Sequence, residues 1–107
     1  MIHTVVKRDG RIVGFNREKI AAAIRKAMLT TEAGEDEVLI YKIVDRIEFR
    51  GKEQSSVEEI QDLVEMELMA SPRKEVAKSY IAYRNKRSIA RKAKTREMFL
   101  EIVEAKS

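Results

Sequence analysis

The chain contains no cysteine and one histidine among its 107 residues. Without cysteine it cannot form a disulfide, a Cys-ligated zinc site or a thiol nucleophile. A single histidine leaves too few ligands for a transition-metal site made by the protein alone. No apolar run approaches the length of a membrane span, and no charged-then-apolar leader resembles a signal peptide, so we expect a cytoplasmic protein.

Motifs for catalysis are also missing. The sequence has no G-x-x-x-x-G-K-[ST] phosphate loop and no histidine–carboxylate pair that suggests a general base. We therefore expect no catalytic residue and no metal site in this chain. Its length suits one domain with a modest core.

Charge is abundant but unevenly distributed. Residues 1–29 hold seven Lys/Arg and two Asp/Glu, and residues 72–96 hold ten and one. Between these cationic segments, residues 30–71 hold four basic and twelve acidic residues. If the two cationic segments pack side by side, they concentrate positive potential at one place. Mutual neutralisation across helix surfaces is the alternative that this distribution leaves open.

The segment from Val5 to Ile20 carries the strongest local signal. Two short apolar runs flank Arg8-Asp9-Gly10, and Asp-Gly in this position predicts a β-hairpin. Asn16 then suits the N-cap of a helix that follows at once. Because the N-terminal N–H groups of a helix attract anions, this geometry predicts a phosphate site. The cations brought to that helix end are Lys7, Arg8 and Lys19.

Helical periodicity covers the rest of the chain. A capping box at Ser56–Glu59 opens the third of four predicted helices, Gly51 is the predicted C′ residue of the second, and Pro72 suits the first turn of the fourth. The residues expected to face inward are Ile20, Ala23, Ile24, Ala27 and Met28; Ile40, Ile43, Val44 and Ile47; Ile60, Leu63, Val64 and Leu68; and Val76, Ala77, Tyr80, Ile81 and Arg84.

The fold class predicted from these elements is mainly α (α+β), with an N-terminal β-hairpin capping a four-helix bundle. A hairpin alone is marginal in water, so its Val/Ile/Phe face must pack on the helices. The last segment, residues 97–107, adds a further apolar stripe of Met98, Phe99, Ile102 and Val103. Either this stripe folds back on the domain, or the chain is a fragment whose remainder covers it; we favour the fragment.

Three separated motifs occur together in this chain. They are V-V-K-R-D-G-R-x-x-x-F-N-x-x-K-I from Val5, E-E-I-Q at residues 58–61 and V-A-K-S-Y-I-A-Y-R-N-K-R at residues 76–87. In this order they resemble the ATP-cone, a nucleotide-binding regulatory domain at the N-terminus of many ribonucleotide reductases. The resemblance covers about residues 3–92. It implies an ATP-cone domain over residues 1–92 and a helical extension over 93–107 toward a missing catalytic domain.

The A-x-x-Y-I-x-Y-R form of the last motif is most similar to the anaerobic, glycyl-radical ribonucleoside-triphosphate reductases. A bacterial repressor of reductase genes also carries this domain, but behind a Cys-rich zinc ribbon that this chain lacks. The resemblance implies ATP or dATP as an allosteric ligand, with Mg²⁺ on its phosphates. It implies the catalytic domain of the same parent as a partner, together with possible oligomerisation.

The resemblance also implies roles for individual residues. Those matching phosphate contacts are Lys7, Arg8, Lys19 and Lys86, with Arg84 adjacent to the last on the same helix. Those matching the base and sugar site are Asn16, Ile20, Ile60 and Gln61, flanked by Val5 and Phe15. Val13 stands where some aerobic members have an acidic residue, so a polar contact made there is absent or replaced in this chain.

Two other classes of function remain as alternatives. The basic stretch from Arg84 to Arg96 can track nucleic-acid phosphates, although its basic residues are not interleaved with aromatics and no recognition-helix motif is present. A pure interaction domain, with helices as docking surfaces, is the other alternative. It predicts that loss of Lys7 and Arg8 leaves stability in excess ATP unchanged.

Overall fold

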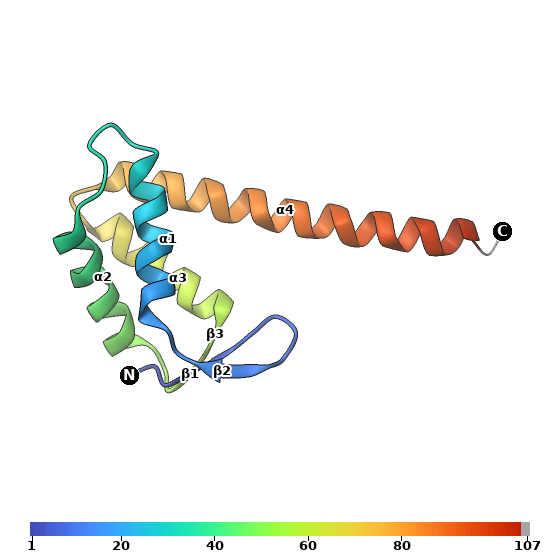
Figure 1. The fold of residues 1–107 in the computed structure, drawn as a ribbon, viewed down its shortest axis with the longest axis horizontal. Coiled ribbons are helices and arrows are strands. Elements are labelled where there is room, and N and C mark those ends of the chain that lie inside the picture. The colour runs from blue at the N-terminus through green and yellow to red at the C-terminus, as the bar shows by residue number, and fades with distance from the viewer. Residues whose placement is uncertain (106–107) are drawn as a thin grey trace.

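A small sheet lies against one end of a four-helix body in the computed structural model of this chain (Figure 1). The structure describes the backbone of residues 1–105 and the side chains of residues 1–94. The elements in order are β1 (Thr4–Val6), β2 (Ile12–Gly14), α1 (Arg17–Leu29), α2 (Glu37–Arg50), β3 (Gln54–Ser56), α3 (Val57–Ala70) and α4 (Lys74–Ala105).

The predicted hairpin is confirmed. Strands β1 and β2 pair antiparallel, with Val6 opposite Ile12. The turn between them places Gly10 at φ 89°, a backbone conformation that glycine adopts without steric cost. The Asp9 carboxylate accepts from the backbone N–H of Arg11 at 3.0 Å, which closes the turn locally.

A third strand extends this hairpin and was not predicted. Residues Gln54–Ser56 pair in parallel with β1, so the sheet order is β2-β1-β3 and β1 is central. The backbone N–H groups of His3 and Thr4 also donate to the carbonyl of Glu53, at 2.8 and 2.9 Å. The expectation of an isolated hairpin on the bundle is therefore corrected, because β1 joins the hairpin directly to the start of α3.

The predicted helix caps are confirmed. Asn16 accepts from the backbone N–H of Glu18 at 3.1 Å and begins α1. Ser56 and Glu59 form the reciprocal capping box of α3, at 3.1 and 3.2 Å. These side chains satisfy N–H groups that a helix leaves without partners, and they fix where each helix begins.

The helices form a closed arrangement in which α1 packs on α2 and α4, and α3 packs on α2 and α4. Most residues predicted to face inward are buried, while Leu63, Ile81 and Arg84 are half-buried. One prediction was wrong: Ala21 is buried, whereas Ala23 is exposed on the side of α1 that faces α4. The buried residues are Ile2, Ile20, Ala21, Ile24, Ala27, Met28, Ile40, Ile43, Val44, Ile47, Ile60, Val64, Leu68, Val76, Ala77 and Tyr80.

Gly51 ends α2 as predicted, but for a different reason. Its backbone is extended (φ −71°, ψ 153°), so the left-handed conformation typical of a C′ glycine is absent at this residue. A Cβ placed there would lie 2.1 Å from Cγ1 of Ile2, a side chain that is only 3% exposed. Glycine is required because the N-terminal segment passes directly over the end of α2.

Helix α4 runs from the body of the domain into the C-terminal segment without interruption (Figure 1). It passes residue 92, where the sequence resemblance ends, as one continuous helix. The predicted apolar stripe at Met98, Phe99, Ile102 and Val103 lies outside the residues whose side chains are described. Over the described part of the chain, no helix is long and apolar enough to cross a membrane.

We predict that Gly51→Ala destabilises the fold by about 1–3 kcal/mol, because the added methyl group must displace Ile2 from the core. Urea unfolding measures this loss. Gly14→Ala is the matched control, since a Cβ there meets no atom within 4 Å and its φ is not positive. Equal stability of the two variants would contradict the role assigned to Gly51.

Candidate functional site

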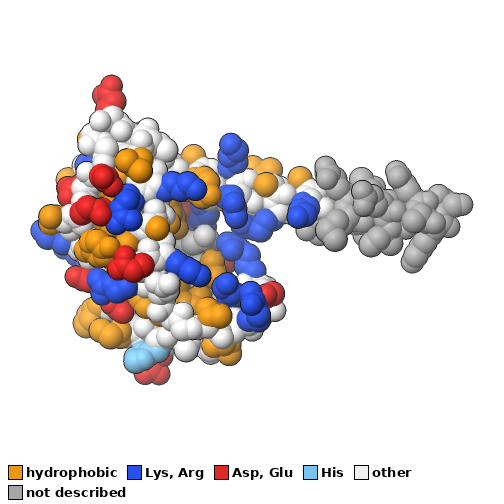
Figure 2. Space-filling model, in the orientation of Figure 1, with side chains coloured by type: hydrophobic (Ala, Val, Ile, Leu, Met, Phe, Trp, Pro, Cys, Tyr) orange, Lys and Arg blue, Asp and Glu red, His pale blue; other side chains and the backbone are white. Residues whose placement is uncertain are grey.

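Two adjoining cavities lie between the hairpin, α1, α3 and α4. The smaller has a volume of about 230 Å³ and the larger about 580 Å³. Ala23, Gln61 and Tyr80 line both, so the two form one continuous recess. Lys and Arg side chains gather around the hollow beneath α4 (Figure 2). The cationic segments at the two ends of the domain therefore face one another across it.

The smaller cavity has apolar walls and a few polar groups. All residues predicted to hold the base and sugar line it, and so do Lys7 and Lys19. Val13 lines it as well, so this wall of the cavity is apolar. The predicted residues along its lining are Val5, Phe15, Asn16, Ile20, Ile60 and Gln61.

Two amides offer hydrogen-bond donors to this cavity. The oxygen of Asn16 is engaged by the N–H of Glu18 at the start of α1. The oxygen of Gln61 accepts from Nη2 of Arg8 at 3.3 Å, and because a guanidinium only donates, this contact fixes which end of the Gln61 amide faces Arg8. Each amide therefore keeps its NH₂ group for another partner.

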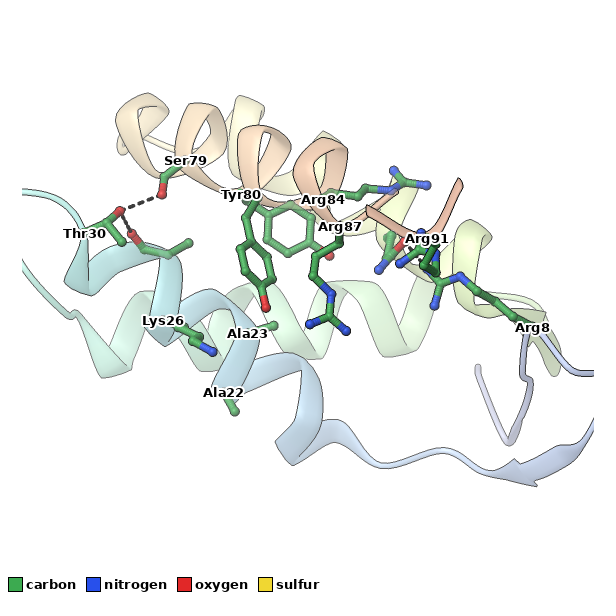
Figure 3. A pocket seen from close by; sticks show the side chains of 13 residues that line it. Arg8, Ala22, Ala23, Lys26, Thr30, Ser79, Tyr80, Arg84, Arg87 and Arg91 are labelled. Carbon is green, nitrogen blue, oxygen red and sulfur yellow. Dashed lines mark hydrogen bonds between the residues drawn. The ribbon is translucent and has the colours of Figure 1, made fainter. Parts of the chain in front are cut away.

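The larger cavity is lined mainly by cations and tyrosines from α1 and α4 (Figure 3). The ring of Tyr83 has Nζ of Lys26 at 5.6 Å and Cζ of Arg87 at 6.0 Å from its centroid, within the range of cation–π interaction. Lys26, Arg87 and Arg91 also line this cavity and were not predicted from the sequence. Arg87 and Arg91, both on α4, could have been predicted from helical periodicity. With Tyr80 and Arg84 they continue the inward face of this helix at helical spacing.

Of the predicted phosphate contacts, Arg8 and Arg84 line the larger cavity. Lys86 is exposed on α4 and lines neither cavity, because it lies outside the inward phase of the helix. Its role as a phosphate contact stays a prediction.

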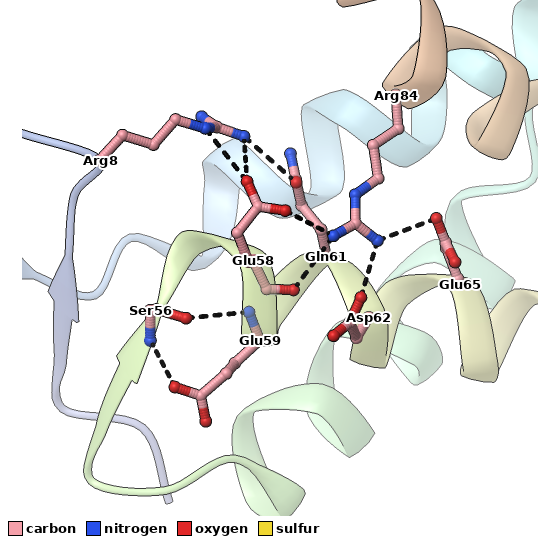
Figure 4. A network of polar contacts seen from close by, with 8 residues as sticks. All are labelled: Arg8, Ser56, Glu58, Glu59, Gln61, Asp62, Glu65 and Arg84. Atoms are coloured by element: carbon pink, nitrogen blue, oxygen red, sulfur yellow. Dashed lines mark hydrogen bonds and ion pairs between the residues drawn. The ribbon is translucent and has the colours of Figure 1, made fainter. Parts of the chain in front are cut away.

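One carboxylate connects three elements at the edge of the larger cavity (Figure 4). Oε1 of Glu58, on α3, accepts from Nε and Nη2 of Arg8 in the hairpin turn, at 3.1 and 2.9 Å. Its other oxygen accepts from Nη2 of Arg84 on α4 at 2.7 Å. Arg84 also donates to Asp62 at 2.8 Å and Glu65 at 2.9 Å.

These contacts shift the pKa values of Glu58 and Arg84. The hydrogen bond from Arg84 lowers the pKa of Glu58 below its ordinary value, against a smaller opposing effect of burial, and the charge of Arg8 lowers it further. Partial burial disfavours the charge of Arg84, but its hydrogen bonds to Glu58, Asp62 and Glu65 outweigh this and raise its pKa. Glu58 and Arg84 are therefore both ionised at neutral pH.

Tyr80 lines both cavities and is 7% exposed. Burial raises the pKa of its phenol to about 12, and the nearby positive charge of Arg84 only partly opposes this shift. Its hydroxyl thus remains a neutral donor and acceptor. Among the described residues, no group of three or more His, Cys, Asp or Glu side chains is arranged to hold a metal ion.

The mainly helical fold with its small N-terminal sheet agrees with the ATP-cone-like fold that the sequence predicts. Residues 3–89 match the ATP cone domain family, and the chain belongs to that family. This confirms the resemblance drawn from the three motifs.

Particular relatives are ribonucleotide reductases of several kinds. The chain is 49% identical over 102 residues to the vitamin B12-dependent ribonucleoside-diphosphate reductase of Thermoplasma acidophilum, covering 88% of this chain and 13% of that protein. It is 38% identical over 93 residues to the anaerobic ribonucleoside-triphosphate reductase of Escherichia coli, covering 86% and 13%. It is also 38% identical over 107 residues to the ribonucleoside-diphosphate reductase subunit alpha of Chlamydia pneumoniae, covering 90% and 10%. The chain thus spans 10% to 13% of these relatives' lengths.

We predict that the free energy of unfolding falls as pH rises from about 10 to about 12. Over this range the phenol of Tyr80 loses its proton in the unfolded chain, whereas its raised pKa keeps it protonated in the folded state. Below the unfolded pKa near 10 the contribution is fully present, and it is lost as the folded phenol titrates. Its size is about 2–3 kcal/mol, from a shift of about two pKa units.

Tyr80→Phe keeps the ring and removes the ionisable group, so the variant should lose this part of the alkaline decline. Urea unfolding of both proteins across the range measures the difference, which cancels the titration of the lysines. Parallel declines in the two proteins would show that Tyr80 ionises freely in the folded state.

Proposed function

We propose that this domain binds ATP or dATP, with the base and sugar in the smaller cavity and the phosphates directed toward Lys7, Lys19 and Arg8. The observation that supports this is the convergence on one recess of the predicted base and sugar residues and of every predicted phosphate contact except Lys86, although these residues come from the hairpin, α1, α3 and α4. The family to which the chain belongs is described as the ATP cone domain.

The smaller cavity suits an adenosine group. Valine, isoleucine and phenylalanine side chains provide apolar walls for a flat ring, and ligand pockets generally combine such walls with a few placed polar groups. The NH₂ groups of Asn16 and Gln61 can donate to acceptor nitrogens of adenine or to oxygens of the ribose. A ligand that lacks the 2′-oxygen leaves a buried donor of the cavity without an acceptor, which costs binding energy. This cost is the basis for discrimination between ATP and dATP.

The phosphates would meet cations of two kinds. Lys7 and Lys19 provide point charges at the mouth of the smaller cavity, and Arg8 provides a planar fork at the larger one. No protein ligand set for a metal exists among the described residues, so we propose that Mg²⁺ arrives coordinated by the phosphates themselves.

We further propose that residues 1–92 form the regulatory domain of a ribonucleotide reductase, which acts in the cytoplasm and makes deoxyribonucleotides. Residues 93–107 would continue α4 toward its catalytic domain, and the enzyme could assemble into oligomers. The last motif and the E. coli relative favour a parent of the anaerobic type, while the higher identity to the T. acidophilum protein makes a B12-dependent parent the alternative. Regulation requires activating and inhibiting nucleotides to stabilise different states of the parent, with couplings of about 1–3 kcal/mol.

We predict that Lys7→Ala and Lys19→Ala each weaken ATP binding about tenfold or more, because each removes a charge-assisted contact worth about 1.5–3 kcal/mol. Calorimetry with ATP, dATP and GTP measures the affinities. Lys42→Ala, an exposed lysine on α2 that lines neither cavity, is the matched control. If the wild type gives no heat with millimolar ATP or dATP but binds an oligonucleotide with steep salt dependence, the nucleic-acid alternative replaces this proposal.

We predict that Ala23→Leu weakens ATP binding about tenfold or more while leaving the domain folded, because the larger side chain projects into the recess and steric overlap costs about 1–3 kcal/mol. Leucine retains high helix propensity within α1. Ala82→Leu, at an exposed position of α4 that lines neither cavity, is the control. Unchanged ATP affinity in the Ala23 variant would place the ligand elsewhere.

A further inference from the structure

The cations around the recess differ in whether a carboxylate of the domain already pairs with them. The described residues give Lys7 and Lys19 no carboxylate within ion-pair distance. Arg8, one residue further along the hairpin turn, is instead held by Glu58 through Nε and Nη2, at 3.1 and 2.9 Å. A phosphate chain that enters along the lysines therefore meets free cations first and an occupied guanidinium afterwards.

We propose that Glu58 occupies the place of a terminal phosphate, so that a nucleoside polyphosphate must displace this carboxylate from Arg8 in order to engage it. The proposal rests on the nucleotide-binding function proposed above. It assigns Glu58 as a specificity-determining residue that acts on long phosphate chains and leaves short ones unaffected.

The chemistry of the two anions makes this exchange direct. Glu58 holds Nε and Nη2 of Arg8 through one oxygen, Oε1, so a phosphate oxygen that accepts from these two donors has to take the place of that carboxylate oxygen. Two anions brought together there also repel each other, with little screening at such short range. A triphosphate consequently gains the Arg8 contact only after losing the interaction energy that Glu58 supplies in the free domain.

The exchange also has a defined structural result. Arg84 keeps its contacts with Asp62 at 2.8 Å and Glu65 at 2.9 Å, so α3 and α4 remain joined when Glu58 moves (Figure 4). Arg8 lies in the hairpin turn between β1 and β2. Displacement of Glu58 therefore removes the ion pair that links the turn to α3 and, through Arg84, to α4, while the contact of Arg8 with Gln61 remains. The length of the phosphate chain decides whether this ion pair is lost.

The test compares Glu58→Gln with Asp62→Asn in the 107-residue chain. Both substitutions remove one negative charge from α3, but only Glu58 contacts Arg8, since Asp62 contacts Arg84 alone. The probes are ATP, AMP and inorganic tripolyphosphate, titrated by calorimetry or NMR. Glu58→Gln should bind ATP and tripolyphosphate about three- to tenfold more tightly than wild type. Asp62→Asn should change either affinity less than about twofold, as should both variants with AMP.

The Nε–H resonance of Arg8 gives a direct second measurement. In the wild type it should shift on addition of ATP or tripolyphosphate and stay in place with AMP. Equal gains in the two variants, or no gain in Glu58→Gln, would overturn the proposal, because general electrostatics would then account for the effect. If Glu58→Gln fails to fold, Glu58→Asp retains the charge at the start of α3 while its shorter side chain draws the carboxylate back, and it should show the same direction of change.

These outcomes separate the proposal from the function on which it rests. A wild type that binds neither ATP nor AMP removes the nucleotide-binding function, whereas tripolyphosphate still reports on Glu58 and Arg8. A wild type that binds ATP with an unmoved Arg8 resonance keeps the function and rejects the displacement of Glu58.

Discussion

The parallel pairing of β1 with β3 is the constraint on which the recess depends. It fixes the hairpin beside the first turn of α3, and so brings Lys7 and Arg8 next to Glu58 and Gln61, which are about fifty residues away in sequence. The Ser56 capping box follows β3 immediately, so the same few residues pair with β1 and begin the helix. Loss of this pairing would separate the cationic turn from the amide that faces the smaller cavity.

Local chemistry explains why much of the fold was predictable. Asp9-Gly10 determines the turn, Asn16 and Ser56 determine where helices begin, and apolar spacing identifies most of the core. Strand β3 was not predictable, because Gln-Ser-Ser has no alternating pattern and becomes a strand only through its partner. Gly51 was correctly predicted to end α2, but the predicted reason was wrong. Glycine is needed there because the side chain of Ile2, near the N-terminus, leaves no room for a Cβ.

The candidate site was predictable to the extent that motifs specify it. Residues of the hairpin motif and of E-E-I-Q reach the smaller cavity as their resemblance implies. On α4, motif matching indicated Lys86, whereas helical phase directs Arg87 into the larger cavity. Glu58 pairs with Arg8 and Arg84, so this contact joins side chains from three elements of the fold. The counts of charged residues in the sequence show that opposite charges are present, but they do not show which of them meet.

The continuity of α4 has a mechanical consequence. The segment that carries Tyr80 and Arg84 in the recess is the same rigid rod that leaves the domain, with no break before Ala105. At about 1.5 Å per residue the distance from Arg84 to that end is roughly 30 Å. A tilt of only a few degrees at the recess would therefore swing the far end by roughly 2–3 Å, so small adjustments of packing beside the cavity are amplified along the helix axis.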